Sequence, residues 1–122
     1  MIIIGAGPGG IYSALELMRL RPDLKVAVFE AGNPLDKRRC PIDGKRVKAC
    51  VNCPTCAIMN GFGGAGAFSD GKYNITNDFG GTLYEYIGRD AAMELMRYVD
   101  GINVQNGGGA TALYFTAGSR FK

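Results

Sequence analysis

The sequence predicts an α/β fold that begins with a βαβ unit, and three observations in the first thirty residues predict it. The apolar run Ile2 to Ile4 leads directly into a glycine-rich turn that ends at Gly10. A second apolar run, residues 25–29, ends at Glu30. Between the turn and Pro22, which is expected to end the helix, apolar residues recur at the i, i+3, i+4 and i+7 spacing of a helix packed on a sheet: Ile11, Ala14, Leu15 and Met18.

The glycine turn has the spacing of a dinucleotide-binding fingerprint. Gly5 permits a tight turn from strand to helix, Gly7 allows the main chain to approach a pyrophosphate, and Gly10 allows the helix and strand to pack closely. Gly9 completes the run at the start of the helix, where unpaired N–H groups and a partial positive charge favour phosphate. The turn therefore predicts a diphosphate site that needs no basic side chain.

Glu30 supplies the second part of this fingerprint. It lies twenty positions beyond Gly10, at the end of the second predicted strand, where a carboxylate accepts hydrogen bonds from the hydroxyls of an adenosine ribose and repels a 2′-phosphate. The alternative is a glycine-rich turn in an ordinary α/β domain, because short matches arise readily in a chain with 19 glycines. The helical periodicity and the acid together favour the dinucleotide site.

The 122 residues provide fewer elements than this fold class requires. Only two parallel strands are predicted, whereas a doubly wound domain needs a sheet of several strands covered on both faces. We therefore expect an incomplete, partial Rossmann-like domain. It divides into a βαβ unit (residues 1–32), a Cys-rich and Gly-rich loop region (33–77) and a helical segment with a tail (78–122).

The sequence gives no sign of a membrane segment or a secretory leader. No apolar run is long enough to span a bilayer, and residues 1–18 lack a basic leader and contain Glu16. A cytoplasmic protein is therefore expected.

The net charge of +3 is concentrated in one segment, residues 37–48. We expect a solvated loop there, the alternative being electrostatic attraction of a phosphorylated or acidic ligand or a redox partner. No aromatic side chains alternate with the charges, which argues against nucleic-acid binding. Against the single acid Asp43, the segment contains six basic residues: Lys37, Arg38, Arg39, Lys45, Arg46 and Lys48.

All four cysteines lie within seventeen residues: Cys40, Cys50, Cys53 and Cys56. In a cytosolic chain this clustering indicates a metal or redox site rather than disulfides. A [4Fe-4S] cluster suits three closely spaced thiolates with a remote Cys-Pro pair, and zinc also accepts four thiolates. There are two further alternatives. Cys53 and Cys56 could form a thiol pair that exchanges electrons with a flavin, or the cysteines could be inert and packed in the interior.

A second glycine-rich run, residues 61–72, follows the last cysteine. Such a density of glycine suggests close approach to a ligand, since each glycine is costly in an ordinary helix or strand. Backbone N–H groups in glycine turns form anion-binding nests, and Ser69, Asp70 and Lys72 are placed to orient polar groups of a ring system. A flexible linker is the alternative, although Phe62 and Phe68 are unusual in linkers.

Two helices are expected in the last third of the chain. A short one covers residues 82–87, Gly88 breaks it, and Asp90 is the expected N-cap of a longer helix that runs toward Asn103 and ends before the glycines at 107–109. Its apolar face indicates packing rather than cofactor binding: Ala92, Leu95, Met96, Val99 and Ile102.

These motifs together resemble a known family. Residues 1–32 are similar to the ADP-binding half of flavoproteins of the glutathione-reductase-like superfamily. Residues 50–77 (CVNCPTCAIMNGFGGAGAFSDGKYNITN) and the run Tyr98 to Val104 resemble FAD-dependent dehydrogenases of the NAD(P)/FAD oxidoreductase class, N-terminal part only. The resemblance implies FAD as cofactor, its ADP half held by Gly5, Gly7, Gly9, Gly10 and Glu30, with a second set near the pyrophosphate or flavin: Gly63, Gly64, Gly66, Ser69 and Asp70.

The resemblance further implies an oxidoreductase that transfers a hydride between a small-molecule substrate and FAD, with NAD(P)H as an electron donor. The chain has no histidine, so we assign no catalytic residue. The rest of a longer polypeptide would complete the domain. Two alternatives remain: a zinc-binding interaction module on a nucleotide-binding scaffold, and an NAD-binding domain, which would not explain the second glycine run.

Overall fold

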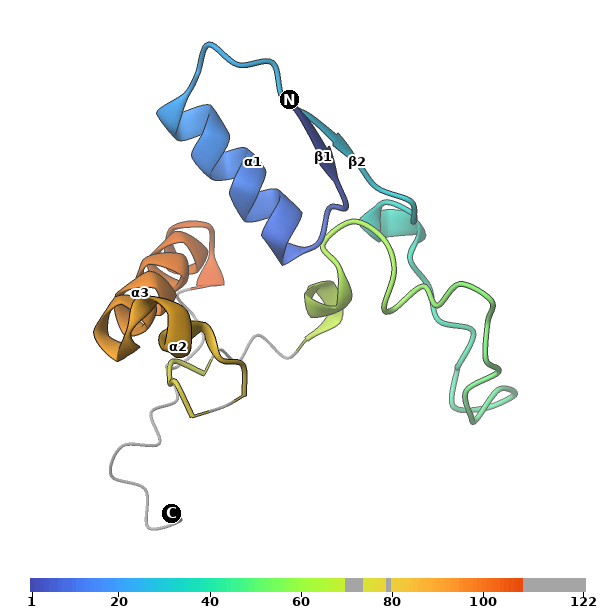
Figure 1. Ribbon diagram of the computed structural model, residues 1–122. Coiled ribbons are helices and arrows are strands. Elements are labelled where there is room, and N and C mark those ends of the chain that lie inside the picture. Colours follow the sequence, from blue (N-terminus) through green and yellow to red (C-terminus); the bar gives the residue numbers. More distant parts are fainter. Residues whose placement is uncertain (70–73, 79, 109–122) are drawn as a thin grey trace. The chain divides into compact units, whose positions relative to one another are not determined.

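The computed structural model describes residues 1–69, 74–78 and 80–108. The chain forms two compact units, Met1–Ser69 and Asp70–Lys122. The first unit contains a parallel two-stranded sheet and a helix, and the described part of the second contains helices α2 and α3 (Figure 1). The predicted mixed α/β composition is therefore observed.

The first unit begins with the predicted βαβ arrangement. Strand β1 (Ile2–Ile4) is followed by helix α1 (Pro8–Leu20) and strand β2 (Ala27–Phe29). The strands pair in parallel, with Ile3 opposite Val28, and helix α1 runs back alongside them (Figure 1). Strand β2 is two residues shorter than expected. The backbone hydrogen bond from Gly5 N to Phe29 O, 2.7 Å, extends the pairing into the turn.

The expected burial of the apolar stripe of α1 is wrong in part. Leu15 and Met18 remain 42% and 53% exposed, and Ile4 of β1 is 89% exposed. The reason is the width of the sheet: two three-residue strands in the described part of the chain cannot cover a four-turn helix face. In this unit Ala6, in the turn after β1, is the buried apolar residue.

Between β2 and the end of the first unit, two short 3₁₀ turns interrupt segments that were predicted as loops. The turn η1 (Leu35–Lys37) follows β2, and η2 (Ala65–Phe68) lies in the second glycine-rich run. Such turns have fewer and poorer hydrogen bonds than α-helices, and the sequence pattern gives no signal for them.

In the second unit, the described residues form helices α2 (Leu83–Ile87) and α3 (Arg89–Gln105). Gly88, with φ of 84°, ends the first and caps the second, so the expected N-cap role of Asp90 is wrong. Asp90 instead lies in the first turn of α3, where its charge suits the helix dipole. Ala92 is buried as expected, whereas Leu95 is half-exposed.

Within the described residues, no helix combines the length and apolarity needed to cross a membrane.

Candidate functional site

The turn between β1 and α1 has the geometry that its glycines predict. Gly5 has φ of 97°, a conformation that L-residues with a side chain rarely adopt. A Cβ atom on Gly10 would lie 1.9 Å from the carbonyl oxygen of Gly5 and 3.4 Å from Ile3 Cγ2. The close packing of helix and strand expected at Gly10 is therefore confirmed.

The N-terminus of α1 has open space at Gly9. Gly7 is the N-cap, makes no side-chain capping bond, and is followed by Pro8 at the first helical position. A Cβ atom on Gly9 would meet nothing within 4 Å. Because the first N–H groups of a helix have no partner within the helix, this end offers donors and partial positive charge to an anion.

Glu30 reaches back to the glycine turn. Its Oε2 accepts a hydrogen bond of 2.7 Å from the backbone N of Ala6, and its Oε1 accepts one of 2.9 Å from the backbone N of Gly32. These N–H groups hold the pKa of Glu30 below its ordinary value, and the bond from Ala6 has the largest effect. Each carboxylate oxygen retains a further lone pair, so the ionised group can still accept two hydrogen bonds.

The second glycine-rich run packs against this turn. Gly63 N donates a hydrogen bond of 2.8 Å to the carbonyl oxygen of Ala6. Gly64, with φ of 62° and ψ of −160°, lies so close that a Cβ atom would be 3.1 Å from both Gly7 Cα and Pro8 Cδ. The structure thus brings together Gly7, Gly63, Gly64 and Glu30 around the backbone of Ala6.

The backbone N–H groups at the start of this run are already occupied. Phe62 N donates to Asn33 O at 3.1 Å, Gly63 N to Ala6 O, and Gly64 N to Gly61 O at 2.9 Å. The expected anion nest does not form from these three groups, since their hydrogen bonds hold the loop in place. The glycines at 63 and 64 are instead explained by close backbone packing.

The remaining predicted residues of this set lie further along the chain. Gly66 is part of η2, and a Cβ atom on it would meet nothing within 4 Å. Ser69 is exposed and its backbone N donates to Gly66 O at 3.1 Å. Asp70 and Lys72 lie outside the described residues. A role for these positions beside a cofactor stays a prediction.

Arg38 is buried, although the charge pattern of residues 37–48 predicts a solvated loop. Its side chain is 3% exposed and donates three hydrogen bonds to carbonyl oxygens, of Ala57 at 2.8 Å, Ile58 at 2.6 Å and Phe62 at 2.6 Å. Its guanidinium also lies 4.8 Å from the centroid of the Phe68 ring. The prediction of solvation is wrong here, because this arginine ties the end of η1 to the second glycine-rich run.

The other basic residues of the segment, from Lys37 to Lys48, are exposed as predicted. The carboxylate of Asp43 binds backbone groups: its Oδ1 accepts hydrogen bonds from the backbone N of Lys45, Arg46 and Val47 at 2.8 to 2.9 Å. These bonds hold the pKa of Asp43 below its ordinary value, and the bond from Val47 has the largest effect. The segment therefore forms a tight turn with positive side chains on its surface.

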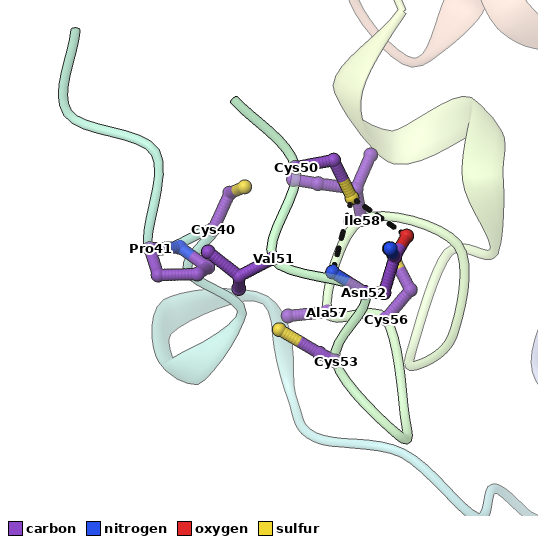
Figure 2. A pocket seen from close by; sticks show the side chains of 9 residues that line it. All are labelled: Cys40, Pro41, Cys50, Val51, Asn52, Cys53, Cys56, Ala57 and Ile58. Carbon is purple, nitrogen blue, oxygen red and sulfur yellow. Dashed lines mark hydrogen bonds between the residues drawn. The ribbon is translucent and has the colours of Figure 1, made fainter. Parts of the chain in front are cut away.

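The four cysteines line one cavity of about 230 Å³ (Figure 2). Cys40 and Pro41 come from one stretch of chain, and Cys50 to Ile58 come from another. All four are free thiols and exposed. The Sγ atom of Cys50 accepts a hydrogen bond of 3.4 Å from the backbone N of Asn52, drawn as a dashed line in Figure 2.

The thiols surround the cavity without converging on one point. In the part of the chain that the structure describes, no three or more His, Cys, Asp or Glu side chains are grouped closely enough to hold a metal ion. The four cysteines thus lie around one cavity, and their role as metal ligands stays a prediction.

Comparison with known proteins finds partial similarity to two proteins. The chain is 39% identical over 71 residues to an uncharacterised protein of Clostridium beijerinckii, a match that covers 58% of this chain. It is 58% identical over 33 residues to a salicyloyl-CoA 5-hydroxylase of Streptomyces, a match that covers 27% of this chain. The matched regions are 13% and 6% of the lengths of those two proteins. No protein-family model and no solved structure matches the chain.

Proposed function

We propose that this chain forms the ADP-binding part of an FAD-dependent oxidoreductase, which transfers a hydride between a small-molecule substrate and the flavin. The observation that carries the proposal is the meeting of Glu30 with the backbone of Ala6 in the glycine turn, at a hydrogen-bond distance of 2.7 Å. This contact brings a carboxylate and a helix N-terminus to the same edge of a parallel sheet, which is where dinucleotides bind in such folds.

The division of labour in this site follows from the groups present. The N-terminus of α1, with Gly9 open toward solvent, would bind the pyrophosphate through backbone donors. Glu30, ionised and with one lone pair left on each oxygen, would accept hydrogen bonds from both ribose hydroxyls. A 2′-phosphate would meet a negative charge there, so the site suits FAD or NAD rather than NADP.

The second glycine-rich run favours FAD over NAD. Two of its glycines fit against the first turn, Gly63 through a hydrogen bond to Ala6 and Gly64 through close contact with Gly7. This loop adds a second backbone surface beside the first turn, which an NAD-binding unit made of the βαβ segment alone would not need. The flavin would supply the redox chemistry, while the protein binds and orients it.

The salicyloyl-CoA 5-hydroxylase supports the oxidoreductase part of the proposal. A hydroxylase is an oxidoreductase, and this one is 58% identical to the chain over 33 residues. The small share of that protein covered by the match, 6%, restricts the inference to the reaction class. The match gives no information on the substrate or the electron donor.

The proposal is tested by identifying the cofactor that the protein carries. The full protein is purified without added nucleotide, denatured, and the released small molecules are separated and identified by mass spectrometry. FAD at close to one molecule per chain is expected, and a Glu30→Gln variant should carry less. Release of NAD would replace the proposal with a nicotinamide-binding domain. An empty protein that binds no FAD on titration would refute it.

A further inference from the structure

We propose that Cys40, Cys50, Cys53 and Cys56 together bind a [4Fe-4S] cluster in the cavity that they line. This inference goes beyond the proposed flavin function, because the cavity is formed by different residues from the glycine turn and Glu30. The chain contains no other cysteine, so every thiol that it has faces this one cavity.

The size of the cavity argues for a cluster rather than a single zinc ion. Zinc holds four sulfurs at about 2.3 Å, which requires the sulfurs to lie within about 4 Å of one another. The described thiols are not grouped in that way, and instead surround a space of about 230 Å³. A polynuclear iron–sulfur core is larger than a single ion and bonds to one thiolate at each iron, so it suits thiols that are spread around a cavity.

The walls of the cavity have the chemistry that such a cluster requires. Apart from the cysteines, the lining is mainly apolar, with Pro41, Val51, Ala57 and Ile58. Apolar walls limit the access of water to a cluster, and hydrogen bonds to its sulfurs adjust its potential. The backbone N of Asn52 already donates to Cys50 Sγ, and Asn52 has φ of 51°, a left-handed conformation that asparagine tolerates well.

Arg38 holds the two walls together. It lies two residues before Cys40, and its guanidinium donates to the carbonyl oxygens of Ala57 and Ile58, which directly follow Cys56. Because these bonds join the start of one cysteine segment to the end of the other, the cavity is defined by the fold and not only by the spacing of cysteines. The exposed basic side chains on the 37–48 segment would also offset the net negative charge of a cluster with four thiolates.

The test is the metal and sulfide content of the full protein, purified anaerobically from iron-supplied cells. The proposal predicts about four iron atoms and about four acid-labile sulfides per chain. It also predicts a paramagnetic resonance signal after reduction with dithionite. Zinc at one per chain without sulfide would overturn the proposal in favour of a structural metal site. Absence of metal before and after anaerobic reconstitution with iron and sulfide would overturn it in favour of redox or inert thiols.

Substitutions then test the ligand set. Single Cys→Ser variants at positions 40, 50, 53 and 56 should each lose most of the iron and sulfide. The matched control is Thr55→Ser, which introduces the same residue in the same loop at an exposed side chain that does not line the cavity, and it should keep both. Full retention of iron and sulfide in Cys40→Ser would overturn the four-cysteine assignment. Flavin is measured on each sample, so loss of the cluster with FAD retained is distinguishable from failure of the FAD proposal.

Discussion

Replacement of Gly10 by alanine tests the packing of the glycine turn most sharply. The new Cβ atom would lie 1.9 Å from the carbonyl oxygen of Gly5, whereas real Cβ contacts essentially never fall below 3.0 Å. The backbone must therefore move by about 1 Å at a turn whose Gly5 N is hydrogen-bonded to Phe29 O. Overpacking of this kind costs about 1–3 kcal/mol, partly offset by the roughly 0.5–1 kcal/mol that alanine gains over glycine in a helix.

Gly9→Ala is the matched control, because the neighbouring position in the same helix has open space around its Cβ. We expect a lower urea midpoint for Gly10→Ala and an equal or higher one for Gly9→Ala, measured by circular dichroism on the full protein without FAD. In FAD titrations, Gly9→Ala should nevertheless bind more weakly, because its methyl group would occupy the space proposed for the pyrophosphate. Equal stability of the two variants would refute the packing argument, and unchanged FAD affinity in Gly9→Ala would refute the role of Gly9.

Four further predictions concern Glu30, the second glycine-rich run and Arg38. Glu30→Gln should weaken FAD binding at least about tenfold in fluorescence titrations, because an amide has one acceptor where the carboxylate serves two N–H groups and the ribose; an unchanged affinity would remove Glu30 from the site. Because folding lowers the pKa of Glu30, the ionised carboxylate should stabilise the folded state fully above the ordinary glutamate pKa of about 4.3. This stabilisation should be lost as the pH falls through the lowered pKa. A carboxyl ¹³C titration midpoint at or above about 4.3 would contradict the prediction. Gly64→Ala should destabilise the protein by about 1–3 kcal/mol in urea denaturation, because φ of 62° with ψ of −160° is accessible mainly to glycine. Gly66→Ala is the control and should not destabilise it. Similar urea midpoints for the two variants would be inconsistent with the observed backbone. Arg38→Met should cost on the order of 3 kcal/mol or more, because it leaves three carbonyl groups without their donor, and a loss below about 1 kcal/mol would show that water replaces the guanidinium.

The sequence predicts the local part of the fold well, because the signals there are local. The turn at Gly5 and the helix after it follow from glycine spacing and apolar periodicity, and both lie within twenty residues. The position of Glu30 at the end of β2 follows from the same pattern. The wrong prediction of the N-cap of α3 has a local cause too. Gly88 and Asp90 are both residue types that occur as N-caps, and the helix begins after Gly88, which has a positive φ.

The contacts that complete the candidate site could not be predicted from the sequence, because they join residues far apart in the chain through backbone atoms. Arg38 lies among five other basic residues and binds carbonyl groups 19 to 24 positions away, which have no side-chain signature. The contact of Gly64 with Gly7 likewise leaves no pattern beyond the presence of glycine. Gly32 offers a similar case, since a Cβ atom on it would lie 2.5 Å from Gly61 Cα.

The central claim, that this chain recognises the ADP half of FAD, is tested most directly by comparing FAD with FMN. FMN contains the same flavin and lacks the adenosine and second phosphate that Glu30 and the N-terminus of α1 would bind. Isothermal titration of the cofactor-free full protein should give an affinity for FAD at least about a hundredfold higher than for FMN. Equal affinities for the two flavins, or binding of neither, would contradict the account.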